Sequence, residues 1–305
     1  MGEFLARRML HSIIAMASLI VLVFFLSRLT GDPAMLYLPE NATLEAVRQF
    51  REQHGFDDPA FVQFLRYLGD VARLDFGYSI RRDMPAMEAV VQAYPWTLRL
   101  VGVTVVLAML IAMTLGPLAA YRPGSPFDRI ASVLSLAAAS TPDFWIAIIA
   151  ILIFAVDLGW LPTSGVGGPQ YWVLPVAVLM FKITGTTTQV VRGSMISTLA
   201  SPYIKAARAK GMQERRIVFI HALRNSVISA ITVAGDQIRG LINGAVIVET
   251  VFGWPGIGKL MIEAITQRDF AVLQACVLAT AAAIFLLNVL IDILYALLDP
   301  RIRLQ

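Results

Sequence analysis

Six long apolar segments constrain the fold of this chain more than any other feature of its sequence. A helix that crosses a bilayer needs about 20 consecutive, mostly apolar residues. Six segments meet this requirement, and they cover residues 9–29, 100–121, 130–156, 171–191, 226–248 and 271–290. Helices satisfy all their backbone hydrogen bonds internally, which the bilayer core demands. The sequence therefore predicts an all-α integral membrane protein with six transmembrane helices.

The composition excludes an ordinary soluble domain. Only 15% of the 305 residues are charged and 57% are hydrophobic, whereas soluble domains carry about 25% charged residues. The Lys and Arg residues gather at the ends of the apolar segments, which favours a lipid bilayer over a nucleic acid as the partner. The single cysteine, Cys276, lies inside an apolar segment, where we expect it to pack. No cluster of His, Cys and Met residues along the sequence indicates a metal site.

The distribution of basic residues predicts the orientation. Arg7 and Arg8 precede the first apolar segment, so we expect the N-terminus on the cytoplasmic side, and six crossings return the C-terminus to that side. With this topology, thirteen Lys and Arg residues lie in inside segments and eight in outside segments. Six of those eight fall in residues 31–95, a long external region in which the rule is weakest.

A short, strongly basic stretch, residues 201–225, separates the fourth and fifth apolar segments. From Arg192 to Arg224, seven Lys and Arg residues stand against one acid, a net charge of +6. The Ala-rich run 203–210 favours a helix, and Gly211 is suited to the end of that helix. A second short helix is predicted from the helical spacing of Ile217, Ile220, His221 and Arg224. We expect a helix, a Gly corner and a helix on the inner face of the membrane.

This stretch resembles the signature loop of permease subunits in binding-protein-dependent ABC importers. That family's pattern is Glu-Ala-Ala followed by a Gly and, further on, Ile-x-Leu-Pro. Here Lys205-Ala206-Ala207 replaces Glu-Ala-Ala, and Gly211 is in register. Leu223 keeps its place, whereas His221 and Arg224 replace the Ile and the Pro.

The resemblance covers nearly the whole chain. It is to the first, B-type permease of the dipeptide, oligopeptide and nickel branch. The other stretches that carry it read RLTGDPA, HGFDDPAFVQFLRYL, LDFGYSI, LGWLPTSG, ETVFGWPGIG and YALLDPRIR. It implies a multi-pass subunit of the bacterial cytoplasmic (inner) membrane that forms half of a translocation path for peptides and works by alternating access.

The same resemblance implies the partners. These are a second permease subunit that completes a heterodimer, one or two ABC ATPase subunits, and an extracytoplasmic substrate-binding protein. ATP and Mg²⁺ would be bound by the ATPase subunits, with no cofactor in this chain. The coupling helix that docks on the ATPase would comprise Tyr203, Lys205, Ala206, Ala207, Arg208, Lys210 and Gly211. An alternative interpretation of the stretch is an amphipathic helix that rests on anionic lipid.

Three ranges describe the expected organisation. Residues 1–30 form the cytoplasmic N-terminal end and the first span, residues 31–96 a small external helical subdomain, and residues 97–305 a five-span transport core that includes the coupling loop 192–225. The external region carries ten acids and six bases, and Thr43 is a candidate helix N-cap. It is expected either to contact the binding protein or to pack as a cap on the span ends.

Ionisable side chains inside the apolar segments are candidates for the transport path, because exposing them to lipid is costly. The candidates are Lys182, Asp236, Arg239 and Asn243. Asp236 and Arg239 are three residues apart, so on a helix they share a face and could pair. A structural pair that holds the bundle together, or that meets the second permease, remains the alternative.

Two external loops are candidates for a gate or a contact with the binding protein. Residues 157–170 contain four glycines and two prolines, and residues 249–259 resemble a hallmark of the same branch. The side chains that we expect to take part are Trp160, Thr163 and Trp254. An ordinary turn without substrate contact is the alternative for the first loop.

The second loop also matches most of a phosphate-binding motif, Gly253-x4-Gly258-Lys259. Leu260 follows instead of the Ser or Thr that would bind Mg²⁺, and the loop is expected outside the membrane. The chain also lacks the His-Glu-x-x-His and Gly-x-Ser-x-Gly signatures of hydrolases. We therefore expect a transport subunit without catalytic residues of its own. The alternative is a channel or ion-coupled carrier that works without an ATPase.

Overall fold

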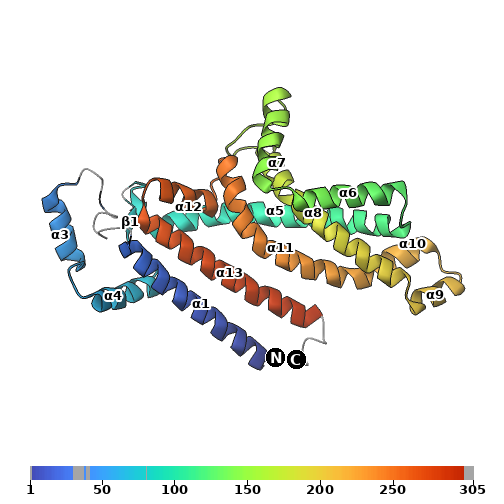
Figure 1. Cartoon of the computed structure of the whole chain (residues 1–305), viewed down its shortest axis with the longest axis horizontal. Helices are drawn as coiled ribbons and strands as arrows, with labels where there is room; N and C mark the ends of the chain where they lie inside the picture. The colour runs from blue at the N-terminus through green and yellow to red at the C-terminus, as the bar shows by residue number, and fades with distance from the viewer. Residues whose placement is uncertain (1, 30–37, 39–41, 80, 299–305) are drawn as a thin grey trace. The chain divides into compact units, whose positions relative to one another are not determined.

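The structure is a computed structural model that describes residues 2–29, 38, 42–79 and 81–298 (Figure 1). Its internal contacts divide the chain into two compact units. Unit 1 consists of Met1–Thr97 and Pro255–Leu290, and unit 2 of Leu98–Trp254 and Ile291–Gln305. Residues 255–290 thus pack with the N-terminal segment. Each unit is described by itself.

Within the described residues, four helices are long and apolar enough to cross a membrane. They are α1 (Gly2–Leu29), α5 (Ala86–Tyr121), α8 (Gln170–Leu199) and α13 (Phe270–Leu298). Two bent helix pairs raise the number of spans to six if each pair counts as one. The predicted all-α membrane fold is confirmed at this level.

The third predicted span is broken rather than continuous. α6 (Pro126–Ser140) ends before Thr141, and α7 (Asp143–Ala150) begins after Pro142, at a bend of 106°. Proline has no N–H to donate and disfavours helical geometry in the residue before it. Thr141 and Pro142 accordingly have extended ψ angles of 132° and 138°. The proline therefore turns the chain sharply inside residues 130–156, which the sequence predicted as one span.

Unit 1 contains α1, α3 (Leu44–His54), α4 (Ala60–Ala72), the start of α5, α12 (Ile257–Thr266) and most of α13. A two-stranded antiparallel sheet, β1 (Tyr78–Ser79) with β2 (Met84–Pro85), precedes α5. Thr43 caps α3 by accepting a hydrogen bond from the Ala46 N–H at 3.2 Å, as predicted. Small side chains of α5, such as Ala89 and Ala93, pack with Ile257 and Leu260 of α12 in the core.

Unit 2 contains the rest of α5, α6, α7, the π-helix η1 (Ile151–Asp157), α8, α9 (Pro202–Ala209), α10 (Glu214–Arg216), the π-helix η2 (Ile217–Ala222) and α11 (Leu223–Val251). The helices approach closely at glycines. A Cβ on Gly185 of α8 would lie 2.6 Å from the Ser135 carbonyl oxygen of α6. A Cβ on Gly116 of α5 would lie 2.6 Å from the Val191 side chain of α8. Small residues thus allow tight packing of helices, as in membrane bundles.

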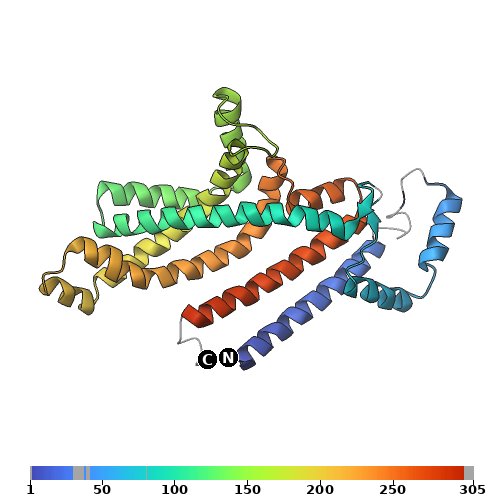
Figure 2. The ribbon, with the colours of Figure 1, turned by 180° about the vertical axis from the view of Figure 1, so that it is seen from behind.

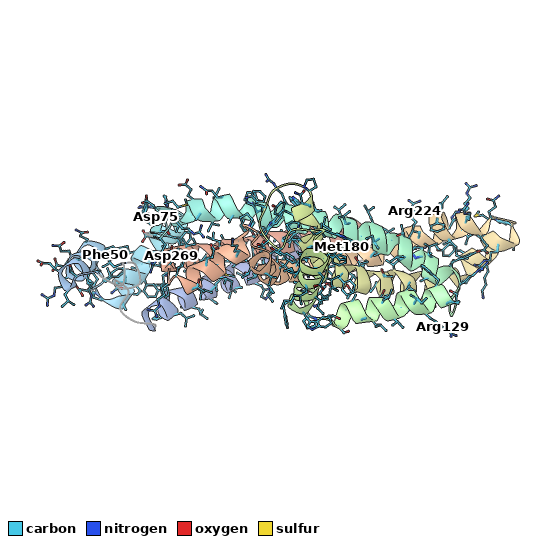
Figure 3. The ribbon with its side chains drawn as sticks, turned by 90° about the horizontal axis from the view of Figure 1, so that it is seen from above. Phe50, Asp75, Arg129, Met180, Arg224 and Asp269 are labelled. Atoms are coloured by element: carbon cyan, nitrogen blue, oxygen red, sulfur yellow. The ribbon has the colours of Figure 1, made fainter. Side chains whose placement is uncertain are left out.

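The two ends of unit 2 differ in what they bring together. At one end the α5–α6 turn and α9 lie close to each other (Figures 1 and 2), and Ala120 shares a buried cluster with Ile204 and Ile217. Figure 3 places Arg129 of α6 and Arg224 of α11 toward that same end. At the other end the Gly165 N–H donates to the Phe252 carbonyl at 2.8 Å. The short segments that connect the helices of unit 2 therefore lie in two groups, one at each end of the unit.

Candidate functional site

α9 is a short helix with sharply defined ends. Pro202 occupies its first turn, where the missing N–H costs nothing. Gly211 follows the helix with φ of +76°, a left-handed conformation that side chains disfavour. The Gly211 N–H donates to the Arg208 carbonyl at 2.9 Å, and the Met212 N–H donates to the Ala207 carbonyl at 3.2 Å. The predicted helix and Gly corner are confirmed.

The segment after this corner differs from the prediction. α10 begins at Glu214, and helical residues continue through η2 and α11 to Val251. The second short helix expected around residues 217–224 is therefore the first part of this helical run, and the run bends by 49° between Val227 and Ala230. Ile217 and Val218 are buried in one cluster with Ile204 of α9.

α9 presents most of the predicted coupling residues on its surface. Ile204 is fully buried and anchors the helix in the cluster that contains Ile217. Ala207 is half-buried. The other six predicted residues are exposed: Tyr203, Lys205, Ala206, Arg208, Lys210 and Gly211. α9 therefore presents small and basic side chains on its outer surface and is held to the bundle by the buried, apolar Ile204.

Two polar contacts hold α9 against the following helix. Asn225 Nδ2 donates to the Tyr203 hydroxyl at 2.6 Å. Arg208 Nε donates to the carboxylate of Glu214 at 2.6 Å, and this hydrogen bond raises the pKa of the guanidinium above its usual value. These contacts link α9 to α10 and to the start of α11.

The polar residues of the apolar segments are only partly brought together. Arg239 Nη1 donates to Asp236 Oδ1 at 2.7 Å on α11, so the predicted (i, i+3) pair is present. The Lys182 side chain is exposed on α8. Asn243 lies in α11, but its side chain is outside the described part of the structure. Gln237 of α11 adds a link to α8 by donating to Thr186 Oγ1 at 3.0 Å.

Asp143 is a candidate that the sequence analysis did not single out. It is the first residue of α7. Within the described part of the chain its buried Oδ1 has no hydrogen-bond partner. Lys182 attracts this carboxylate electrostatically, and a Cβ on Gly244 of α11 would lie 3.3 Å from Oδ2. The signal in the sequence was an aspartate directly after a proline inside an apolar segment, where a carboxylate indicates function.

The loop at the other end of unit 2 separates the three predicted outer residues. Trp160 is 69% exposed and Thr163 is exposed. Trp254 is fully buried, and its ring meets Trp172 edge to face with centroids 4.6 Å apart. In this conformation Trp254 therefore packs inside the unit, and only Trp160 and Thr163 present a surface for contact.

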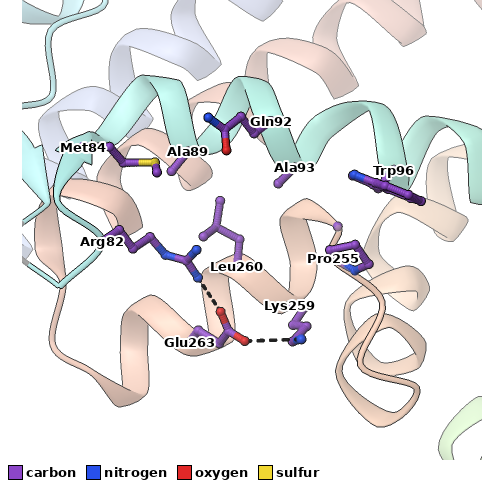
Figure 4. A pocket seen from close by; sticks show the side chains of 11 residues that line it. Arg82, Met84, Ala89, Gln92, Ala93, Trp96, Pro255, Lys259, Leu260 and Glu263 are labelled. Atoms are coloured by element: carbon purple, nitrogen blue, oxygen red, sulfur yellow. Dashed lines mark hydrogen bonds and ion pairs between the residues drawn. The ribbon is translucent and has the colours of Figure 1, made fainter. Parts of the chain in front are cut away.

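Unit 1 contains a pocket of about 260 Å³ between the start of α5 and α12 (Figure 4). Glu263 lies at its edge and forms ion pairs with Arg82 and with Lys259, whose Nζ is 3.5 Å from Oε1. Trp96 and Leu260 contribute apolar walls. Lys259 is the last residue of the segment that matches most of a phosphate-binding motif. It is thus paired with Glu263, one turn further along α12.

Comparisons with known proteins cover the full length. Residues 101–304 match the family of the binding-protein-dependent transport system inner membrane component, and residues 1–101 match the N-terminal family of the same membrane component. The oligopeptide transport system permease protein AppB of Bacillus subtilis is 36% identical over 99% of this chain and 100% of its own length. The glutathione transport system permease protein GsiC of Salmonella paratyphi A is 36% identical over 99% of both chains.

A solved structure supports the fold. A chain from the crystal structure of an amino acid ABC transporter superposes with a TM-score of 0.53 and 17% identity, over 70% of this chain and 94% of that chain. This likeness shows a similar fold. The two family matches and the relatives at 36% identity show that the chain and these proteins have a common ancestor. The chain belongs to the family of inner membrane permease components of binding-protein-dependent transport systems.

Proposed function

We propose that this chain forms half of the translocation path of an ATP-driven peptide importer and couples that path to separate ATPase subunits through α9. The relatives named above are permeases for oligopeptides and for glutathione, a small peptide. Short peptides are therefore the substrate class that we propose. The other half of the path would come from a second permease subunit in a heterodimer.

The surface of α9 is the observation that carries this proposal. An exposed helix of small and basic side chains rests on one buried anchor, Ile204, and ends at a fixed Gly corner. Ala206 leaves room for a partner's groove, and the flanking cations Lys205 and Arg208 favour an acidic rim. The contacts from Tyr203 and Arg208 to the next helix supply a mechanical link into the bundle.

The proposed mechanism is alternating access. ATP binding closes two ATPase subunits on the cytoplasmic side, and α9 moves with them, so that the path opens to a binding protein outside. Hydrolysis of ATP then resets the inward-facing state. In this mechanism ATP and Mg²⁺ are bound by one or two partner ATPases, and both termini of this chain lie in the cytoplasm.

We assign the residues that line the translocation path, and those that contact the binding protein, from their positions on the helices and loops. Asp236 and Arg239 form a partly exposed pair on α11 near the α8 polar residues, and Lys182 is exposed on α8. Asn243, one turn beyond Arg239, is kept in this set. On the outer side, Trp160 and Thr163 provide the contact with the extracytoplasmic binding protein. The six-span topology follows if each bent helix pair crosses the membrane as one span.

The test is retention of the ATPase by the tagged chain, purified from its native cells in mild detergent and identified by mass spectrometry. Recovery of one or two P-loop ATPases and a second permease supports the proposal. Ala206→Trp blocks docking without disturbing the core, because Ala206 is exposed. Gly211→Ala strains the corner at φ +76°. Both variants are expected to lose the ATPase.

Gly159→Ala is the matched control. Gly159 has φ of +64° and, like Gly211, open space where a Cβ would lie, so the substitution brings the same backbone strain at the other end of unit 2. It should keep the ATPase. If the unmodified chain is recovered alone, or only with itself, the coupling proposal fails and a channel or ion-coupled carrier becomes the better account.

A further inference from the structure

α4 carries an apolar strip that the fold leaves uncovered. Phe61 is 70% exposed and Leu65 is 52% exposed. They are four residues apart, so their side chains lie one above the other on the helix. Leu68 and Ala72 continue the same face at helical spacing. Two large, uncovered apolar side chains side by side indicate an interaction surface.

A different face of α4 is polar and is occupied by local contacts. Gln63 Nε2 donates to the carbonyl oxygens of Phe56 and Asp58, both at 2.8 Å. Arg66 forms an ion pair with the Asp58 carboxylate at 2.9 Å. By helical periodicity, Gln63 lies opposite the strip of Phe61 and Leu65, and Arg66 lies about 100° around the helix from Leu65. α4 is therefore amphipathic with a clear division between its faces.

A third face fixes where α4 lies relative to the bilayer. The rings of Phe64 and Tyr67 pack on Phe24 of α1, with centroid distances of 5.1 and 5.6 Å. Phe24 is 1% exposed and lies close to the end of the apolar window Met9–Leu26. Since α1 crosses the membrane, its last residues mark the boundary between the hydrocarbon and the headgroups. α4 is held across that end of α1 (Figure 1).

Other apolar side chains near this end of α1 are also exposed. Near the same end of α1, Leu22 and Phe25 are each 52% exposed and Leu26 is 49% exposed. Apolar residues on a single-helix span meet lipid where protein does not cover them. The contacts with Phe24 hold α4 at the end of the apolar window of α1, which is the level at which interfacial helices lie.

We propose that α4 is a membrane-interfacial helix, which inserts Phe61 and Leu65 into the headgroup–acyl boundary of the outer leaflet beside α1. The polar face with Gln63 and Arg66 then points to water. The helix would fix the depth of the external subdomain and the outer end of α1. The proposal stands on the packing of unit 1 and does not depend on which substrate is transported.

Site-directed spin labelling tests this placement. The chain has a single cysteine, Cys276, so a Cys276→Ala background allows one nitroxide at a time. Phe61→Cys and Leu65→Cys report the strip, Phe25→Cys is the lipid reference and Arg66→Cys is the water reference. The full chain, with the subunits that copurify, is reconstituted into phosphatidylcholine vesicles. Collision with oxygen, which concentrates in lipid, is compared with collision with a water-soluble nickel chelate.

The expected result is a shift toward oxygen at positions 61 and 65 that matches position 25, with the opposite shift at position 66. If positions 61 and 65 collide mainly with the nickel chelate, the strip faces water and the proposal is wrong. If neither reagent reaches them, a protein partner covers the strip, and the proposal is equally overturned. Two strip positions guard against one variant that misfolds, and each sample must elute as a single species.

Discussion

Arg192 of α8 donates hydrogen bonds to both carboxylate oxygens of Asp128 on α6, where the Asp128 side chain is only 3% exposed. The Gly124 N–H donates to the same carboxylate at 2.8 Å. One buried acid thus joins the α5–α6 turn to α8, at the end of unit 2 that also carries α9.

We predict that neither member of this pair can be removed alone. Asp128→Leu leaves the Arg192 guanidinium without its ion-pair partner, and Arg192→Met leaves the buried Asp128 carboxylate without its ion-pair partner. Removal of one partner of a buried pair costs about 3–5 kcal/mol, whereas an apolar replacement of both is often nearly neutral. Each single variant should therefore unfold at a lower temperature, and the double variant should recover most of the loss. Thermal unfolding in detergent checks this, and additive effects of the two substitutions would contradict it.

Gly185 is predicted to be irreplaceable at the contact of α6 with α8. A Cβ there would lie 2.6 Å from a backbone oxygen and 2.9 Å from the Ala138 Cβ, so Gly185→Ala must push the helices apart. Overpacking of this kind costs about 1–3 kcal/mol. Thermal unfolding of the purified protein measures the loss.

Gly193 on the same helix is the matched control, because no atom lies within 4 Å of the point that a Cβ would occupy there. Alanine is favoured over glycine inside a helix by about 0.5–1 kcal/mol, so Gly193→Ala should leave stability unchanged or raise it. Equal losses in both variants would show that the close approach at Gly185 is not the cause.

Asp143 is predicted to lower the stability of the folded protein and to support transport. Relief of the buried Oδ1, which has no hydrogen-bond partner among the described residues, gains about 1–3 kcal/mol, and loss of the interaction of the carboxylate with the α7 N-terminus costs about 0.3–1 kcal/mol. Asp143→Ala should thus raise the unfolding temperature while it lowers peptide uptake by cells that carry this variant as their only copy. Asp157→Ala, at an exposed position, should change neither. Unchanged uptake in Asp143→Ala would remove Asp143 from the path.

Features that depend on neighbours in the chain could be predicted from the sequence. The Thr43 cap, the Gly211 corner and the Asp236–Arg239 pair each involve residues within a few positions of one another. Their geometry follows from backbone preferences and helical spacing. The apolar segments likewise determined the helices, because a single segment inside a bilayer can satisfy its backbone hydrogen bonds only as a helix.

Features that depend on distant residues could not be predicted. Trp254 was expected to take part in a gate or in a contact with the binding protein, and no local pattern indicated that the fold buries its ring against Trp172. Residues 130–156 were predicted as one span, yet the chain bends by 106° between α6 and α7, and α7 packs on α8 and α11. Asp128 and Arg192 are 64 residues apart, and no local pattern links them.

The sequence by itself determined that this protein is a helical membrane protein with a basic, Ala-rich loop that ends at a glycine, since segment length, charge and short-range geometry are properties of the chain. Only the tertiary structure decided which polar groups are buried, which aromatic residues reach the surface, and that α4 lies across the end of α1. Burial and exposure are set by the partners that pack around a side chain, and those partners come from remote parts of the sequence.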